Sequence, residues 1–155
     1  MSLESVREEC ERLGLGLTIV ETVEETSTVE RAARVLGVEE ARIAKTLAFR
    51  LADKAVMLLV TRGDARIDNA KFKQRFGRGK MLVPEEVEAL TGHPVGGVCP
   101  FGLPSRLPIF ADLSLQAFDR VYPAAGNRNS ALCIAPDLLA QATQATWVDV
   151  CKLAD

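Results

Sequence analysis

A lysine at the head of an apolar strand is the first residue whose position suggests chemistry. Lys45 begins the run KTLAFRL, in which Leu47, Phe49 and Leu51 recur at every second position and so share its face. An ammonium group at the mouth of an apolar face must reach water or meet an anion. Lys45 therefore either extends past the strand end into solvent or binds an anionic group of a ligand.

A glycine-rich segment, GHPVGGVCP at residues 92–100, is the second candidate site. Gly96 and Gly97 allow the backbone to approach a ligand closely and to expose its N–H donors, and the prolines on either side stiffen the segment. Donors held in this way suit the polarisation of a carbonyl group during acyl transfer. A tight structural turn is the alternative interpretation.

Three other positions carry polar or nucleophilic groups. Residues 126–130, GNRNS, form either a donor-rich binding loop or a simple turn. Asp112 ends an apolar strand, where it could face a pocket or cap the segment that follows. Cys99 and His93 lie six residues apart in the proline-rich loop, so a cysteine-dependent hydrolase is a further hypothesis.

Several kinds of site lack their motif. The single histidine and the missing GxSxG elbow argue against a Ser-His-Asp triad. The chain has neither a Walker loop nor a GxGxxG motif, and its four cysteines form no CxxC pair. We therefore expect no metal site and no cofactor.

Basic residues are concentrated in residues 62–80. This segment holds seven lysines and arginines and two aspartates, whereas the whole chain has a net charge of −2. Such a cluster attracts phosphate backbones, although a solvated helix face would look the same. The candidates for contact with the phosphates of a nucleic acid are Arg66, Lys71, Lys73 and Arg75.

Length and composition predict one globular domain over residues 1–155. Hydrophobic residues make up 48% of the chain and charged residues 26%, which is enough apolar material for a core without disulfides or metal ions. The N-terminus does not resemble a signal peptide, and the longest apolar run, AVMLLV, is too short to cross a bilayer. A cytoplasmic location and no membrane partner are expected.

The elements that must position these residues alternate between short helices and strands without a regular βαβ rhythm. Strands are expected at residues 45–51 and 55–61, joined as a hairpin, and at 80–83, 107–112, 131–135 and 146–151. A capping box at Ser27 and Glu30, Asp68 and Pro84 each mark a helix start. This pattern favours an α+β fold with a mixed sheet.

Four segments together resemble the YbaK/prolyl-tRNA-synthetase-associated editing family, over nearly the whole chain. They are IAKTLAF at residues 43–49, GGVCPFG at 96–102, LPIFAD at 107–112 and GNRNSALCIAPDLL at 126–139. Their order and spacing agree with the family, also labelled ProX-like. The resemblance implies a single-domain mixed β-barrel with peripheral helices.

The resemblance also implies a function. Family members hydrolyse the ester between a small wrong amino acid and its tRNA, and here the substrate is expected to be tRNA-Pro carrying cysteine, alanine or a similar residue. Lys45 matches the family lysine that binds a phosphate near the terminal adenosine, and Gly97 completes the catalytic pair. A terminal ribose hydroxyl of the tRNA is expected to activate water or to attack directly.

The remaining site residues follow from the same motifs. The GxxxP loop is expected to hold the aminoacyl carbonyl and to exclude larger side chains. Residues expected to contact the substrate are Thr46, Gly96, Val98, Cys99, Pro100, Asp112, Asn127 and Asn129. Some relatives carry a histidine in the loop that reads GNRNS here, and Asn127 or Asn129 could take its place.

Aminoacyl-tRNA is the expected partner, together with prolyl-tRNA synthetase, and DNA binding is not expected. The alternative to a deacylase is a non-catalytic module that binds charged tRNA or a synthetase.

Overall fold

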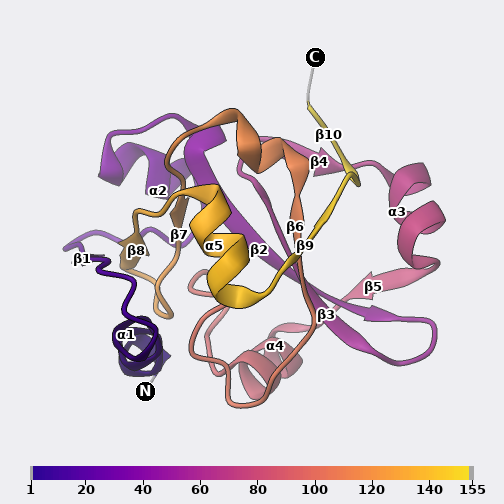
Figure 1. Ribbon diagram of the computed structural model, residues 1–155, viewed down its shortest axis with the longest axis horizontal. Helices are drawn as coiled ribbons and strands as arrows, with labels where there is room; N and C mark the ends of the chain where they lie inside the picture. Colours follow the sequence, from indigo (N-terminus) through magenta and orange to yellow (C-terminus); the bar gives the residue numbers. More distant parts are fainter. Residues whose placement is uncertain (1, 154–155) are drawn as a thin grey trace.

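A long antiparallel hairpin forms the centre of the sheet in the computed structural model, which describes residues 2–153 (Figure 1). Its strands are β2 (Ile43–Leu51) and β3 (Val56–Arg62), and their register pairs Lys45 with Thr61. Asp53 stabilises the turn between them by accepting a hydrogen bond from the Ala55 amide at 3.0 Å. The predicted hairpin is therefore confirmed.

The other strands extend this hairpin into a mixed sheet of order β5-β2-β3-β6-β9, with β7 also beside β2. Strand β5 is antiparallel to β2, whereas β7, β6 and β9 run parallel to their neighbours. The bounds of these added strands are Gly79–Met81 for β5, Ile109–Asp112 for β6, Tyr122–Pro123 for β7 and Thr146–Val148 for β9.

Two small antiparallel sheets flank the main one. Strand β1 (Ile19–Glu21) pairs with β8 (Ser130–Leu132), and β4 (Ala65–Ile67) pairs with β10 (Cys151–Leu153). The α+β prediction with a mixed sheet is confirmed. Within residues 2–153 no pairing joins the outer strands β5 and β9, so closure into a barrel stays a prediction.

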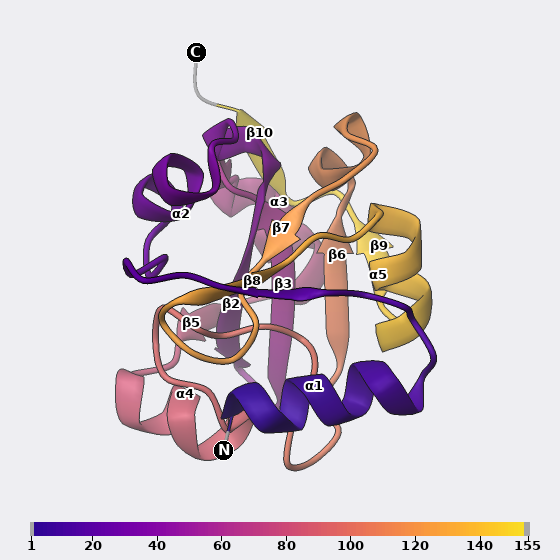
Figure 2. The ribbon, with the colours of Figure 1, turned by 90° about the vertical axis from the view of Figure 1, so that its left-hand side faces the viewer.

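Short helices surround the sheet. Figure 2 shows α2 near the top of the view and α4 near its bottom, with β2 between them. The helices are α1 (Ser2–Arg12), α2 (Val29–Leu36), α3 (Asn69–Phe76), α4 (Pro84–Thr91) and α5 (Pro136–Thr143), and 3₁₀ turns lie at Glu40–Arg42 and Leu113–Ala117.

The helix caps lie where the sequence predicted them, with one exception. Asp68 caps α3 by accepting from the Ala70 and Lys71 amides, both at 3.1 Å. The capping box predicted at Ser27 was wrong, because Thr28 is the N-cap of α2 and accepts from the Arg31 amide at 3.1 Å. Ser27 is thereby left outside the helix, where it lines a cavity.

The predicted strand at residues 146–151 was also wrong in its extent. It is divided into β9 in the main sheet and β10 in a small one. The division occurs because the Val150 amide donates to Asp112 Oδ1 at 2.9 Å rather than to a neighbouring strand.

Alternation along β2 separates two apolar clusters. Ala44 and Ala48 belong to the main core, whereas Leu47 and Phe49 pack with Phe72 of α3 in a second cluster. Phe49 and Phe72 lie with ring centroids 4.8 Å apart. Lys45 shares the face of Leu47 and Phe49, as predicted, while Thr46 shares the face of the main core.

Candidate active site

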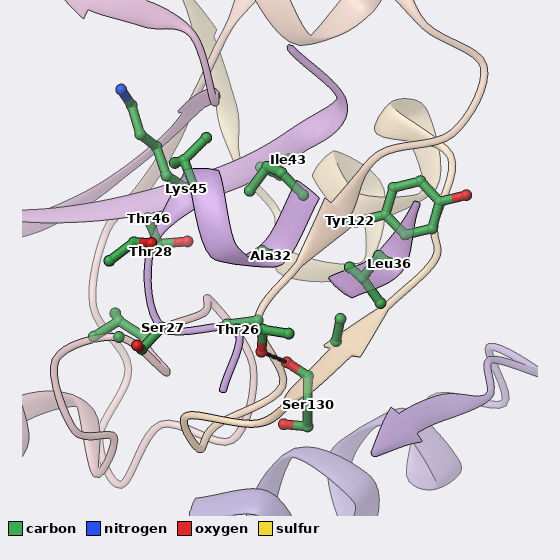
Figure 3. Close-up of a pocket in the computed structure, with 16 residues that line it drawn as sticks. Thr26, Ser27, Thr28, Ala32, Leu36, Ile43, Lys45, Thr46, Tyr122 and Ser130 are labelled. Carbon is green, nitrogen blue, oxygen red and sulfur yellow. Dashed lines mark hydrogen bonds between the residues drawn. The ribbon is translucent and has the colours of Figure 1, made fainter. Parts of the chain in front are cut away.

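A cavity of about 240 Å³ lies where the start of β2, helix α2, the GGVCP loop and the segment around β7 and β8 meet (Figure 3). Its apolar wall includes Ala32 and Leu36 of α2 and Ile43 of β2. Its polar lining consists of Thr26, Ser27, Thr28, Lys45, Thr46, Tyr122 and Ser130. Among the predicted site residues, Lys45, Thr46, Gly96 and Val98 line this cavity.

The ammonium of Lys45 is held at the edge of the cavity. Its Nζ donates to the carbonyl oxygens of Gly63 at 3.1 Å and Ala65 at 2.6 Å, and Figure 3 shows the side chain extending away from the other labelled residues. A lysine ammonium carries three N–H donors, so two carbonyl acceptors leave one donor for an anion. Burial lowers the pKa of Lys45, and the nearby charge of Asp64 partly offsets that shift.

The GGVCP loop is wedged between two backbone segments. A Cβ atom on Gly96 would lie 2.8 Å from the Ser27 Cβ, and one on Gly97 would lie 2.6 Å from the Asn127 carbonyl oxygen. Gly96 also has a φ of +95°, in the region that favours glycine. Both positions therefore require glycine for close approach to neighbouring segments of the protein, whereas the predicted approach to a ligand stays a prediction.

Within the loop, Gly97 faces away from the cavity. Its amide donates to the Pro94 carbonyl at 2.9 Å and its carbonyl accepts from the Gly126 amide at 3.0 Å. Gly97 and Pro100 are also absent from the cavity lining, whereas Gly96 and Val98 belong to it. The structure thus gives Gly97 a packing role and brings Gly96 and Val98 to the cavity, while a catalytic role of Gly97 stays a prediction.

Cys99 and His93 are close together but belong to the core. The Cys99 Sγ lies 3.8 Å from His93 Nε2, and that nitrogen lies 2.6 Å from the Phe101 carbonyl oxygen. Both side chains are fully buried, and burial raises the pKa of Cys99 to about 12. Cys99 was predicted to contact the substrate, but it does not line the cavity. Its thiol stays protonated at neutral pH, unlike that of a reactive cysteine.

Replacing Cys99 with alanine is expected to leave the catalytic activity of the protein within about twofold of wild type, because the thiol lies outside the cavity. The lost core contacts should lower the free energy of unfolding by about 1 kcal/mol. Activity per folded molecule, with denaturant unfolding as the control, measures both effects. A loss of activity without a loss of stability would revive the cysteine hydrolase hypothesis.

Asp112 is a capping residue rather than a cavity residue. It is buried, and its carboxylate accepts from the amides of Ser114 and Val150, each at 2.9 Å. Of the two alternatives raised by the sequence, the structure supports the cap.

Asn127 and Asn129 hold the cavity wall in place without lining it. Asn127 Oδ1 accepts from the Ser130 hydroxyl at 2.6 Å, and Ser130 does line the cavity. Asn129 Nδ2 donates to the Thr22 carbonyl at 2.8 Å, which ties the GNRNS loop to the segment that leads into α2. These contacts give both residues a positioning role, and their direct contact with substrate stays a prediction.

The sequence did not indicate that α2 and the residues before it form part of the cavity wall. Thr26, Ser27 and Thr28 form a polar run in front of an amphipathic helix, and Ala32 lies on the buried face of that helix. Such a run was interpreted only as a helix cap. Nothing in the sequence shows that α2 faces the loop at residues 96–98, because that contact joins segments far apart in the chain.

The predicted tRNA-binding residues lie on β4 and α3, outside the cavity. The Lys71 ammonium is 3.0 Å from Asp149, whose hydrogen bond raises the pKa of Lys71, and the Arg75 guanidinium stacks on Phe76 and Phe110. Arg66 neighbours Ala65, whose carbonyl accepts from Lys45. Lys45 is therefore hydrogen-bonded to β4, the strand that carries Arg66.

Comparison with known proteins gives a consistent picture. A family model described as the aminoacyl-tRNA editing domain matches residues 23–142. The Bacillus subtilis protein YwhH is 45% identical over 98% of both chains. A proposed Cys-tRNA(Pro)/Cys-tRNA(Cys) deacylase of Enterococcus faecalis is 27% identical over 82% of this chain and 79% of its own.

A solved structure is similar over the same extent. It is described as a proposed trans-editing enzyme for prolyl tRNA synthetase, and it matches with a TM-score of 0.89 and 31% identity over 97% of each chain. Proline–tRNA ligases match as well, but the chain spans only 22% of the length of the Solidesulfovibrio magneticus enzyme.

Two other kinds of feature are absent from the part of the chain that the structure describes. No helix within residues 2–153 is long and apolar enough to cross a membrane. The same residues contain no group of three or more metal-ligating side chains.

Proposed function

Because the chain belongs to the aminoacyl-tRNA editing domain family, we propose that it hydrolyses the ester between a small wrong amino acid and tRNA-Pro, acting in trans. The products are the free amino acid and the uncharged tRNA. The observation that supports this proposal most directly is the cavity that brings Lys45 together with Gly96 and Val98. We further propose that residues 1–155 form one such domain, acting in the cytoplasm where tRNAs are charged.

Each group at the cavity has a role in this reaction. The third N–H of Lys45 binds a phosphate near the terminal adenosine. The amides of Gly96 and Val98, which donate no hydrogen bond within residues 2–153, polarise the ester carbonyl and stabilise the oxyanion that forms from it.

Water activation is assigned to the substrate. Lys45 and Tyr122 are the only ionisable side chains among the described residues that line the cavity, so neither a histidine nor a carboxylate is placed to accept the proton of water. A hydroxyl of the terminal ribose, which lies next to the ester, supplies that function in this proposal.

Size selection comes from the walls. A cavity of about 240 Å³ bounded by Ala32, Leu36 and Ile43 accepts a small, weakly polar side chain such as that of alanine or cysteine. The Enterococcus faecalis relative supports cysteine, and the trans-editing structure supports tRNA-Pro. Phosphates of the acceptor stem would then meet Arg66, Lys71, Lys73 and Arg75.

Incubation with tRNA-Pro charged with cysteine, alanine, serine or proline tests the proposal. We expect rapid loss of the cysteinyl or alanyl ester and a slower loss of the bulkier prolyl ester. Retention of every ester would contradict the enzyme assignment. Binding of charged tRNA without ester loss would instead identify a non-catalytic module. Full activity in the absence of prolyl-tRNA synthetase would establish action in trans.

A further inference from the structure

Strand β2 has a gap along one edge. That edge pairs with β7 at Ile43 and Ala44 and with β5 from Phe49 to Leu51. No strand pairs with residues 45–47 on this side within the described chain, and Lys45 and Thr46 of this stretch line the cavity.

The register shows which backbone groups face the gap. The Leu82 amide donates to the Ala48 carbonyl and the Ala52 amide donates to the Arg78 carbonyl, both at 3.0 Å, so the even-numbered residues of β2 face the β5 edge. Alternate residues of a strand direct their N–H and C=O groups to the same side. Thr46 therefore points both of its backbone polar groups into the gap, away from β3.

The side chain of Thr46 adds a third polar group. Its Oγ1 is buried and has no hydrogen-bond partner among the described residues, and Thr46 lines the cavity. Buried polar groups are nearly always hydrogen-bonded in native proteins. Thr46 thus presents an N–H, a C=O and an O–H that can each form a hydrogen bond with a polar ligand.

The charges of the cavity limit what this ligand could be. No carboxylate is among the described lining residues, and the one ammonium, that of Lys45, is bound to the Gly63 and Ala65 carbonyls. A positively charged group bound beside Thr46 must therefore be held by neutral oxygens. The Thr46 carbonyl is such an acceptor. Gly96 and Val98 line the same cavity, and their amides donate no hydrogen bond among the described residues. An α-amino acid ester offers an ammonium donor beside a carbonyl acceptor, which matches this arrangement.

Resting on the deacylase function above, we propose that Thr46 holds the α-aminoacyl group as a short added strand would be held. Its C=O accepts from the substrate α-ammonium, and its hydroxyl donates to a substrate oxygen. The protein therefore selects esters with a free α-amino group. N-acylated esters, such as peptidyl-tRNA, are rejected because acylation removes the charge and places bulk against the β2 edge between β5 and β7.

The decisive test compares alanyl- and cysteinyl-tRNA-Pro with their N-acetyl derivatives. We expect the free amines to be hydrolysed at least about tenfold faster, the equivalent of one lost hydrogen bond to a charged group. Equal rates would overturn this inference while leaving the deacylase function intact. If neither the free-amine ester nor its N-acetyl derivative is hydrolysed, both this inference and the deacylase function are contradicted.

Two substitutions test Thr46 itself. Thr46→Val retains shape but lacks the hydroxyl, and we expect KM to rise about 2- to 12-fold with little change in kcat. Thr46→Ser should restore the wild-type KM, which a purely packing role would not allow. Both variants should keep the preference for free amines, because that preference depends on the backbone.

A binding measurement gives a readout that does not require turnover. A non-hydrolysable 3′-alanylamido-adenosine should shift the backbone amide signals of Thr46, Gly96 and Val98 in the ¹⁵N-labelled protein, and its N-acetyl derivative should shift them much less. Unchanged Thr46 signals at saturating ligand would exclude the proposed contact.

Discussion

Replacing Lys45 with methionine is expected to lower kcat/KM for deacylation by roughly 10- to 150-fold, the equivalent of one charge-assisted hydrogen bond to phosphate. Methionine keeps most of the apolar stem of lysine but has no ammonium. Rates measured on mischarged tRNA-Pro, under conditions where the variant is fully folded, give the effect. Full activity in this variant would remove Lys45 from the mechanism.

The same substitution has a structural consequence that must be measured separately. The carbonyl groups of Gly63 and Ala65 each lose the Lys45 donor, at 3.1 and 2.6 Å respectively. We expect the free energy of unfolding to fall by about 1–3 kcal/mol. Denaturant unfolding distinguishes this loss from the loss of phosphate binding.

A pH profile supplies the matched control for the charge. Because burial lowers the pKa of Lys45, the ammonium loses its proton at a lower pH than an exposed lysine would. Enzymatic activity should therefore decline as pH rises through that lowered pKa. Lys45→Arg, whose guanidinium stays charged at higher pH, should lack this decline even if its rate is reduced by the different geometry.

The second large effect is expected at Gly96. Gly96→Ala should reduce kcat/KM by roughly 100-fold, because a shift of about 1 Å in a reacting group can cost that much. An alanine Cβ would lie 2.8 Å from the Ser27 Cβ, so the loop would have to move away from the wall that precedes α2. This movement would displace the Gly96 and Val98 amides from the ester carbonyl. Deacylation rates on the same mischarged tRNA measure this fall in kcat/KM.

Gly77→Ala is the matched control for backbone strain. Gly77 has a φ of +77°, a Cβ added there would meet nothing within 4 Å, and the residue ends α3 away from the cavity. The positive-φ backbone should lower stability by about 1–3 kcal/mol in each variant, because alanine is strained in either conformation. Only Gly96→Ala should lose activity, and equal losses in the two variants would show that strain alone is responsible.

Local elements were predictable because their determinants lie within a few residues. Asp68 caps α3 as its position predicts, Gly37 ends α2 with a φ of +71°, and Lys45 shares a face with Leu47 and Phe49. One local prediction failed by a single residue, since Thr28 rather than Ser27 caps α2, and another failed because a distant group competes. Asp112 accepts from the Val150 amide and interrupts the expected last strand, although 38 positions separate the two residues.

The candidate site shows the same division. Lys45 and the GGVCP loop were identified from residue types and from the order of motifs, and both contribute to one cavity. Which members of those motifs face the cavity was not readable. Gly97 and Cys99 are directed into packing contacts, while Thr26, Thr28 and Ala32, in a segment without a catalytic signature, form part of the wall.

The sequence by itself determined the fold class and most of the elements, because these depend on periodicity, capping and residue type. The order of four motifs indicated the family, and that resemblance suggested the roles of the lysine and the glycines. Only the tertiary structure decided where the Lys45 ammonium is held, which loop residues line the cavity, and that β2 has no described partner strand at Thr46 on the edge opposite β3. These features depend on pairings between segments dozens of residues apart. Such pairings arise from the packing of the whole chain, which no short stretch of residues encodes.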